Sequence, residues 1–396
     1  MSRKNIILTD RLMRPIAHFS HAARVGSLVH VGAVAGVFPD LRLAGDQVGR
    51  IDMAAQVERM FDNLATTLSL MGAELADLVR VKTYIAFPRD VAIYARAFAA
   101  RFAGIKIAHS VVGSWDFPLP QAAIELDAVA VIDGDARALQ APGQASVPGE
   151  AGGGVLCDGV HYATARPIDI DGQVGSHDGR QQAVATLRNL AAMLAAADLK
   201  PADVCSLHLT LADLRERAVV DEELRRFFGD RLPACTFVGA PLAAADWRLT
   251  IETVAVKGGG RPIETRSAPL RAGVSAPAML AGDLLFIGGQ HGLDQESAGD
   301  VAQQTRAAWE RVHSLVDAAG FPVDSILRTN NVLTDWRDYA GFNAGYGANV
   351  AAPYVPRATV LGQLSETRAR VQVEAVAHRH GDAASILQVA PPRAAS

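Results

Sequence analysis

Hydrophobic positions recur with the same helical spacing in three segments of the chain, which begin at Ala54, Gly179 and Asp300. In each segment the apolar residues lie three or four positions apart, so a helix would carry them on one face. The apolar residues are Val57, Phe61, Leu64, Leu68 and Met71; then Val184, Leu187, Leu190 and Leu194; then Trp309, Val312, Val316 and Ala319. The pattern predicts three amphipathic helices, each packed on a core by one face.

Each predicted helix stands in the same order of elements. A strand pair precedes it, around LVHVGAVAG, GVHYATARP or LLFIGGQHG, and a β-rich run follows, LVRVKTYIAF, VCSLHLTLAD or ILRTNNVLTD. A second helix then begins near Asp90, Arg215 or Asp338, and the segment closes on IELDAVAV, LTIETVAV or VQVEAVAH. The order strand, strand, helix, strand, helix, strand, strand predicts the α+β class, with mixed sheets that carry helices on one face.

The three segments keep a constant register. Equivalent positions recur after 126 and then 122 residues, as in Gln56, Gln182 and Gln304, and again in His109, Cys235 and Arg357. A register that holds across two helices and a strand identifies three tandem copies of one module. We expect modules at residues 1–133, 150–256 and 268–380. The Gly- and Pro-rich segments 134–154 and 257–268 are interpreted as linkers, and the tail from Gly381 as a loosely held end.

The closing strands alternate in a way that bears on assembly. In residues 124–131, Leu126 and Ala128 point to one face of the sheet, and Glu125 and Asp127 point to the other. Helices on one face of each sheet leave the apolar residues of the second face exposed to solvent. Packing the three sheets against one another would bury that second face. We therefore expect the modules to close into an intramolecular pseudo-trimer, as a monomer or a small homo-oligomer of the chain.

Composition narrows the function classes. Hydrophobic residues make up 49% and charged residues 20% of the chain, as in soluble globular proteins. The formal net charge of -4 gives no reason to expect a nucleic acid or an anionic membrane as partner. No apolar stretch is long enough to span a membrane, the N-terminal residues lack a secretory signal, and the three cysteines are far apart. These features indicate a cytoplasmic protein whose partner is a small polar metabolite or another protein.

The third copy carries a more specific set of motifs. LAGDLLFIGGQHGLD, DVAQQTRAAWERV, NNVLTDWRDYAGFNAGY, VPRATV and VQVEAVA follow one another in residues 280–377, and the copy resembles the RidA/YjgF family along its whole length. Members of that family are trimers of single chorismate-mutase-like modules. They hydrolyse 2-imino and 2-enamino acids to keto acids and ammonia in clefts between subunits, without a metal or a cofactor. The resemblance implies a covalently built trimer with a small carboxylate substrate.

The chemistry of this reaction explains which residues matter. An imino acid presents a carboxylate beside an electrophilic C=N carbon, so its site needs a planar cationic group for the carboxylate and a group that handles water and protons. In the third copy the resemblance assigns carboxylate binding to Arg357, with Asn343 from the second helix and Gly289 and Gln290 from the early turn. The water-handling position is occupied by Gln372, with Glu374 as the second acid of the motif.

The other two copies depart from this set. In the first copy the arginine position is His109, and Glu125 occupies the water-handling position. The remaining departures are Ala95 at the asparagine position of the first copy, and Cys235, Thr250 and Asp221 in the second copy, which keeps only Glu252 of the acid pair. No copy holds the complete set. The candidate catalytic residues are therefore Glu125, Gln372 and Glu374, and the candidate substrate-binding residues are Arg357, Asn343, Gln290, Gly289 and His109.

Alternative interpretations stay open. His109 is interpreted as a structural histidine, as a weaker carboxylate holder, or as an acid/base that acts with Glu125. Cys235 is interpreted as a small buried residue rather than a nucleophile, because no activating partner is visible. The histidines show no metal-binding spacing. The favoured function is a hydrolytic deaminase for an imine or enamine of the aminoacrylate or aminomuconate type. A metabolite-binding or scaffolding protein, and a hydrolase of another C–N bond such as a cyclic amide, are the alternatives.

Overall fold

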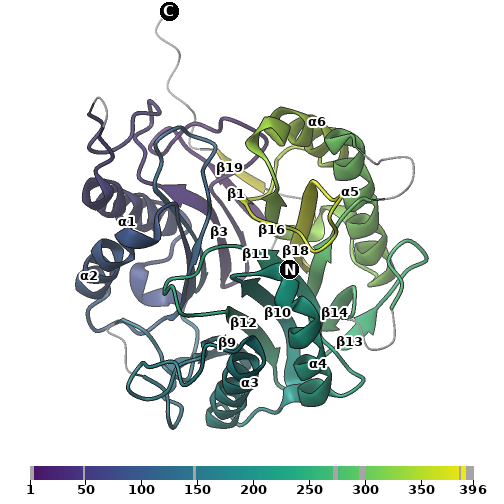
Figure 1. The fold of residues 1–396 in the computed structure, drawn as a ribbon. Helices are drawn as coiled ribbons and strands as arrows, with labels where there is room; N and C mark the ends of the chain where they lie inside the picture. The colour runs from purple at the N-terminus through teal and green to yellow at the C-terminus, as the bar shows by residue number, and fades with distance from the viewer. Residues whose placement is uncertain are drawn as a thin grey trace, which may run out of the picture.

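A computed structural model describes residues 4–47, 50–145, 149–270, 275–293, 299–382 and 385–388. It contains three mixed sheets, each accompanied by two helices (Figure 1). Each sheet is formed by one continuous part of the chain, except that the first also receives β19 from the C-terminal part. We call these units modules 1, 2 and 3. The predicted α+β class, three tandem modules and helices on one face of each sheet are confirmed.

Module 1 has the strand order β19-β1-β2-β3-β6-β4-β5, module 2 the order β11-β10-β12-β9-β8-β7, and module 3 the order β13-β14-β15-β18-β16-β17. The elements of module 1 are β1 (Asn5–Leu8), β2 (Ala22–Val25), β3 (Leu28–Ala35), α1 (Met53–Leu70), β4 (Leu78–Ile85), α2 (Val91–Arg101), β5 (Ala108–Gly113) and β6 (Ile124–Val131). Those of module 2 are β7 (Ala136–Ala138), β8 (Val155–Cys157), β9 (Val160–Ala165), α3 (Gly179–Ala196), β10 (Val204–Leu211), α4 (Arg217–Phe228), β11 (Ala234–Gly239) and β12 (Leu249–Val256). Those of module 3 are β13 (Arg261–Ile263), β14 (Ala278–Ala281), β15 (Leu284–Gln290), α5 (Val301–Ala318), β16 (Ile326–Leu333), α6 (Tyr339–Asn349), β17 (Arg357–Leu361) and β18 (Val371–His378), and β19 (Ser385–Gln388) returns to module 1.

The first helix of each module begins at the same kind of residue. Asp52, Asp178 and Asp300 precede α1, α3 and α5, and each carboxylate accepts a hydrogen bond from a backbone N–H of the first turn. The predicted apolar faces are buried except at one position, since Val184 is exposed. Ala183 takes its place in the core, because the spacing 183, 187, 190, 194 follows the helical period more closely than one that begins at residue 184.

The predicted linkers contain strands. β7 pairs with β8 and β13 pairs with β14, so each linker adds an edge strand to the module that follows it. In the predicted loose tail, β19 pairs in parallel with β1 near the start of the chain. Three- and four-residue strands at a sheet edge need main-chain partners rather than an alternating side-chain pattern, so hydrophobic periodicity did not reveal them.

Each module contacts the other two. β5 lies against β9, β11 against β15, and β17 against β3. Glycines permit two of these approaches: a Cβ atom on Gly32 would lie 3.0 Å from the Arg357 backbone nitrogen, and one on Gly288 would lie 2.7 Å from the Cys235 carbonyl oxygen. The sheet faces opposite the helices therefore meet one another, with the three modules arranged about a common centre (Figure 1).

Charged residues from all three modules gather where the sheets meet. Arg80 forms ion pairs of 2.7 Å with Asp127 and with Glu252, and Arg328 pairs with Asp127 at 2.7 Å. Lys82 pairs with Glu252 at 2.6 Å. Removal of one partner from such a buried network leaves a charge uncompensated, so the network favours this arrangement of the modules over others. We call these residues, together with His208 and Glu374, the central charge cluster.

Candidate functional site

In the part of the chain that the structure describes, a cleft lies at each join between modules. We call them the 3–1, 2–3 and 1–2 clefts after the modules that form them. Their volumes are about 40, 450 and 20 Å³ respectively. Each cleft combines the start of the parallel edge strand of one module with the β3-, β9- or β15-type strand of the next. A complete set of site residues is therefore shared by two modules and is not contained in one.

The 3–1 cleft is lined by Arg357, Tyr339 and Thr359 of module 3, and by residues of module 1 that include Glu125 and Ala33. Arg357 opens β17 and is buried. Its Nη2 donates to Asn343 Oδ1 at 2.5 Å, and its guanidinium lies 4.4 Å from the ring centre of Tyr346. These contacts fix the plane of the guanidinium.

The other terminal nitrogen of Arg357 is not satisfied. Nη1 is buried and has no hydrogen-bond partner among the described residues. A buried charged donor without a partner carries the free-energy cost of its lost hydration. A hydrogen bond to an anion would remove that cost.

Glu125 approaches the same cleft from β6 of module 1. It is 7% exposed, and burial raises the pKa of its carboxyl to about 8. No ion pair or hydrogen bond to this carboxyl occurs among the described residues, so it does not pair with Arg357 although both line the cleft. At neutral pH it is mostly protonated and can donate a proton. The cleft thus contains a guanidinium cation and a neutral carboxyl that form no ion pair with each other.

The 1–2 cleft is filled by the chain itself. Glu150, from the segment between modules 1 and 2, lies 2.7 Å from His109 Nδ1 and forms a 2.7 Å ion pair with Arg166. Tyr94 Oη holds the other ring nitrogen of His109 at 2.8 Å. Burial disfavours the Glu150 carboxylate, but Arg166 and His109 outweigh it and lower its pKa to about 2. His109 therefore contacts a carboxylate, and that carboxylate belongs to the protein.

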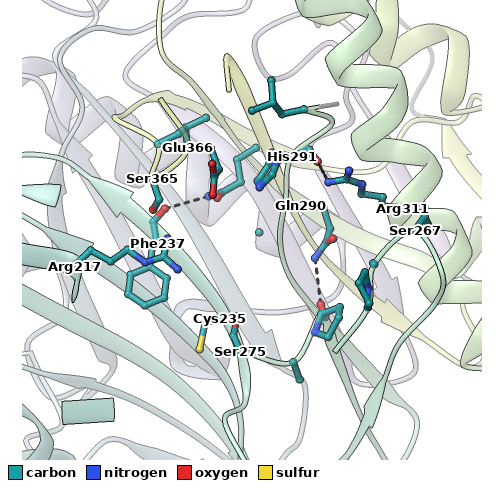
Figure 2. A pocket seen from close by; sticks show the side chains of 18 of the residues that line it. Arg217, Cys235, Phe237, Ser267, Ser275, Gln290, His291, Arg311, Ser365 and Glu366 are labelled. Atoms are coloured by element: carbon teal, nitrogen blue, oxygen red, sulfur yellow. Dashed lines mark hydrogen bonds between the residues drawn. The ribbon is translucent and has the colours of Figure 1, made fainter. Parts of the chain in front are cut away.

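The 2–3 cleft contains Gly289, Gln290 and Gln372 of module 3, opposite Cys235 of module 2 (Figure 2). Burial raises the pKa of the Cys235 thiol, so the sulfur stays protonated at neutral pH and is not an activated nucleophile. The predicted residues of the third copy are thus divided between two clefts. Arg357 lines the 3–1 cleft and is held by Asn343, which does not line it, whereas Gly289, Gln290 and Gln372 line the 2–3 cleft.

Glu374 lies in none of the three clefts. Its carboxylate is 2.7 Å from His208 Nδ1 in the central charge cluster. Burial opposes its ionisation, but His208, Arg328 and Lys82 outweigh that effect and lower its pKa to about 2. It points to the same sheet face as Gln372, but two residues along a strand displace a side chain by about 7 Å, enough to move it from the cleft to the centre.

Comparison with known proteins agrees with this architecture. Residues 9–132, 156–257 and 265–379 match the family model described as Endoribonuclease L-PSP. The chain belongs to this family. The resemblance to RidA/YjgF proteins in three tandem copies is confirmed, since single-module RutC relatives align with parts of the chain.

One such relative is the 2-iminobutanoate/2-iminopropanoate deaminase of Salmonella typhimurium, 30% identical over 125 residues that cover 30% of this chain and 98% of the relative. Another is the RutC family protein y4sK of Sinorhizobium fredii, 30% identical over 119 residues, or 29% of this chain and 94% of the relative. A crystal structure of a chorismatase superposes with a TM-score of 0.53 at 12% identity, over 76% of this chain and 93% of that one, which shows a shared fold.

Two further features bear on the possible chemistry. Within the described ranges, no group of three or more His, Cys, Asp and Glu side chains could hold a metal ion. None of the helices in these ranges is long and apolar enough to cross a membrane.

Proposed function

We propose that the protein hydrolyses an imine or enamine of a small carboxylic acid to an oxo acid and ammonia in the 3–1 cleft. The observation that carries this proposal is that Arg357 and Glu125 line the same cleft without forming an ion pair with each other. One offers an unsatisfied guanidinium nitrogen, and the other offers a proton at neutral pH. The similarity to a protein named 2-iminobutanoate/2-iminopropanoate deaminase supports the same reaction class.

Arg357 binds the substrate carboxylate and so fixes the neighbouring C=N carbon. Asn343 and the Tyr346 ring hold the guanidinium in one orientation, which reduces the entropy lost when the carboxylate binds. The carboxylate satisfies Nη1, which makes binding favourable in a buried site. The C=N group then lies on the side of the cleft to which Glu125 contributes its carboxyl.

Glu125 handles the protons of the reaction. Its neutral carboxyl protonates the imine nitrogen, or the β-carbon of an enamine, and the C=N carbon becomes more electrophilic. The resulting carboxylate accepts a proton from the water that attacks this carbon, and a carbinolamine forms. Glu125 returns the proton to the nitrogen, and the C–N bond breaks so that ammonia leaves. As the C=O bond forms, the carbinolamine hydroxyl gives its proton to the Glu125 carboxylate. One water is consumed, and Glu125 regains its starting state.

Apolar side chains limit which substrates fit. Met13, Ile16 and Phe19 of module 1 line one wall of the cleft, with Leu119 nearby. Such a wall excludes a second charged group and favours a short apolar side chain on the imino acid. We therefore place 2-iminopropanoate and 2-iminobutanoate ahead of the aminomuconate type.

Ammonia release from freshly generated imines tests the proposal. An amino acid oxidase would form 2-iminopropanoate and 2-iminobutanoate in situ, and the wild-type protein should accelerate ammonia release over the uncatalysed rate. No acceleration, combined with thermal stabilisation by the matching oxo acids, would identify a metabolite-binding protein instead. Ring opening of cyclic amides in parallel reactions, without imine hydrolysis, would assign the chain to another C–N hydrolase class.

A further inference from the structure

The 2–3 cleft is the largest of the three clefts between modules, at about 450 Å³. Pockets of this size commonly hold small organic ligands. Figure 2 shows that side chains from two modules converge on it, with Arg217, Cys235 and Phe237 on one side and Gln290, His291 and Arg311 on the other. The reaction proposed for the 3–1 cleft leaves this cavity unused.

Substitutions at equivalent positions explain why this cleft is open. Cys235 stands where module 3 has Arg357, so a long side chain is replaced by a short one. Gly289 faces Gln372 so closely that a Cβ atom would lie 2.5 Å from the Gln372 side chain. The short side chain of Cys235 leaves space between the modules, and polar side chains such as Gln290 and Gln372 line that space.

The 2–3 cleft has no arginine at the position equivalent to Arg357, but it has one at another position of module 2. Arg217, at the position equivalent to Tyr339 of module 3, lies 3.9 Å from the ring centre of Phe237. That contact anchors the guanidinium at the cleft wall contributed by module 2. Its ion pair with Asp221 is long, at 3.3 Å, and both side chains are partly exposed, so it competes weakly with a ligand.

Module 3 contributes two more arginines. Arg311 occupies the position at which the other modules have Asn63 and Asn189, whose amides donate to loop carbonyls. Arg311 keeps this role by donating to the His291 carbonyl, and its longer side chain also reaches the cleft. Arg368 lines the same wall and is exposed. Among the described lining residues, Glu366 is the one carboxylate, against the three arginines Arg217, Arg311 and Arg368.

The groups that would carry out deamination are replaced here. Gln372, at the position equivalent to Glu125, cannot donate or accept a proton as a carboxyl does, and it donates a 3.4 Å hydrogen bond to the Phe237 carbonyl. The amide of Gln290 donates to the Gly288 carbonyl at 3.0 Å. Neutral amides beside arginines suit recognition of an anion with hydrogen-bonding groups rather than proton transfer.

We propose that the 2–3 cleft is a second ligand site, for a small organic anion with at least two acid groups. One acid group contacts Arg217 of module 2, and another contacts Arg311 or Arg368 of module 3. Gln372 provides a neutral hydrogen bond between them, whereas the amide N–H groups of Gln290 donate to the Pro277 and Gly288 carbonyls. The ligand is larger and more highly charged than the imino acid assigned to the 3–1 cleft, and the assignment does not depend on that activity.

Isothermal titration of the full chain tests this site with three probes: citrate, 3-phosphoglycerate and acetate. Citrate or 3-phosphoglycerate should bind and acetate should bind far more weakly, and the stronger of the two anions tells whether carboxylate or phosphate groups are recognised. R217Q should weaken that binding about tenfold or more, the loss expected for a hydrogen bond to a charged group.

Two matched variants serve as controls. R215Q changes an arginine two residues away whose side chain is 90% exposed, and R357Q changes the 3–1 cleft. Both should leave the dissociation constant unchanged within about twofold, since neither removes a hydrogen bond to the anion. If R217Q fails to fold, R368Q at an exposed position replaces it in the comparison. The proposal is overturned if neither polyanion binds, if binding persists in R217Q and R368Q, or if R357Q is the variant that loses it.

Discussion

Replacement of Glu125 with Gln separates the chemical role of this residue from its effect on stability. The folded protein holds the Glu125 pKa at about 8, against an ordinary value of 4.5, because the carboxyl is buried. A carboxyl with a raised pKa contributes stability fully at pH values below 4.5. That stability is lost as the pH rises through 8, because the folded state resists ionisation. A glutamine at this position does not titrate and suffers no such loss.

The magnitude follows from the size of the shift. Between 4.5 and 8 each pH unit costs the wild-type protein up to about 1.4 kcal/mol relative to the glutamine variant. From pH 6 to pH 9 the free energy of unfolding of E125Q should therefore rise by roughly 3 kcal/mol relative to wild type. Over the same range the variant should show no imine hydrolysis, since it lacks the proton donor.

Urea denaturation at pH 6 and pH 9 measures this difference. E58Q, at an exposed position of α1, is the matched control, and its difference from wild type should be the same at both pH values. A flat difference for E125Q would refute the reasoning, because Glu125 would then be ionised in the folded protein at neutral pH. Wild-type activity that rises through pH 8 would refute the assignment of a protonated carboxyl.

Four other predictions follow from the same structure. R357K should lower kcat/KM for an imino acid by about ten- to a hundredfold, because the ammonium keeps the charge but loses the bidentate geometry; steady-state ammonia release measures this. C235S should retain activity within about twofold, since the neutral thiol is not a nucleophile. At pH 7 the free energy of unfolding of E150Q should be roughly 3 kcal/mol lower than that of wild type. This difference should shrink as the pH falls from 4.5 through 2, because the wild-type Glu150 carboxylate then becomes protonated as well. Sedimentation should give a particle of one chain, 41.8 kDa, or a small multiple of it, and a three-chain particle would contradict this prediction. A chain cut at Gly153 should not yield independently folded pieces, because each piece would expose an apolar sheet face.

Hydrophobic periodicity predicted most of the fold. The stripes at Phe61 and Trp309 are wide and strongly apolar, so the helices and their register were evident. The edge strands β7, β13 and β19 were missed because three or four residues with main-chain pairing leave no periodic signal. Val184 was misplaced because a valine at the margin of a helical face looks like one at its centre.

The candidate site could be predicted only in part. The sequence reasoning left open whether Gln372, Glu374 or a Glu125 from another copy acts with Arg357. The choice depends on how module 3 packs against module 1, which no local pattern encodes. The contact of Glu150 with His109 depends on the path of the segment between modules 1 and 2. Arg217 was missed because the motif expects an arginine at the position of Cys235, not at the start of the second helix. In each case tertiary packing decides which neighbour a side chain meets.

The central claim is that Arg357 and Glu125, from different modules, act on the same substrate. A double-mutant cycle on ammonia release with wild type, R357Q, E125Q and the double variant tests this most directly. We predict that each single variant loses most of the activity and that the double variant is little slower than the slower single, because the two groups act as one unit. A double variant that retains wild-type activity, or losses that multiply as for independent sites, would contradict the account.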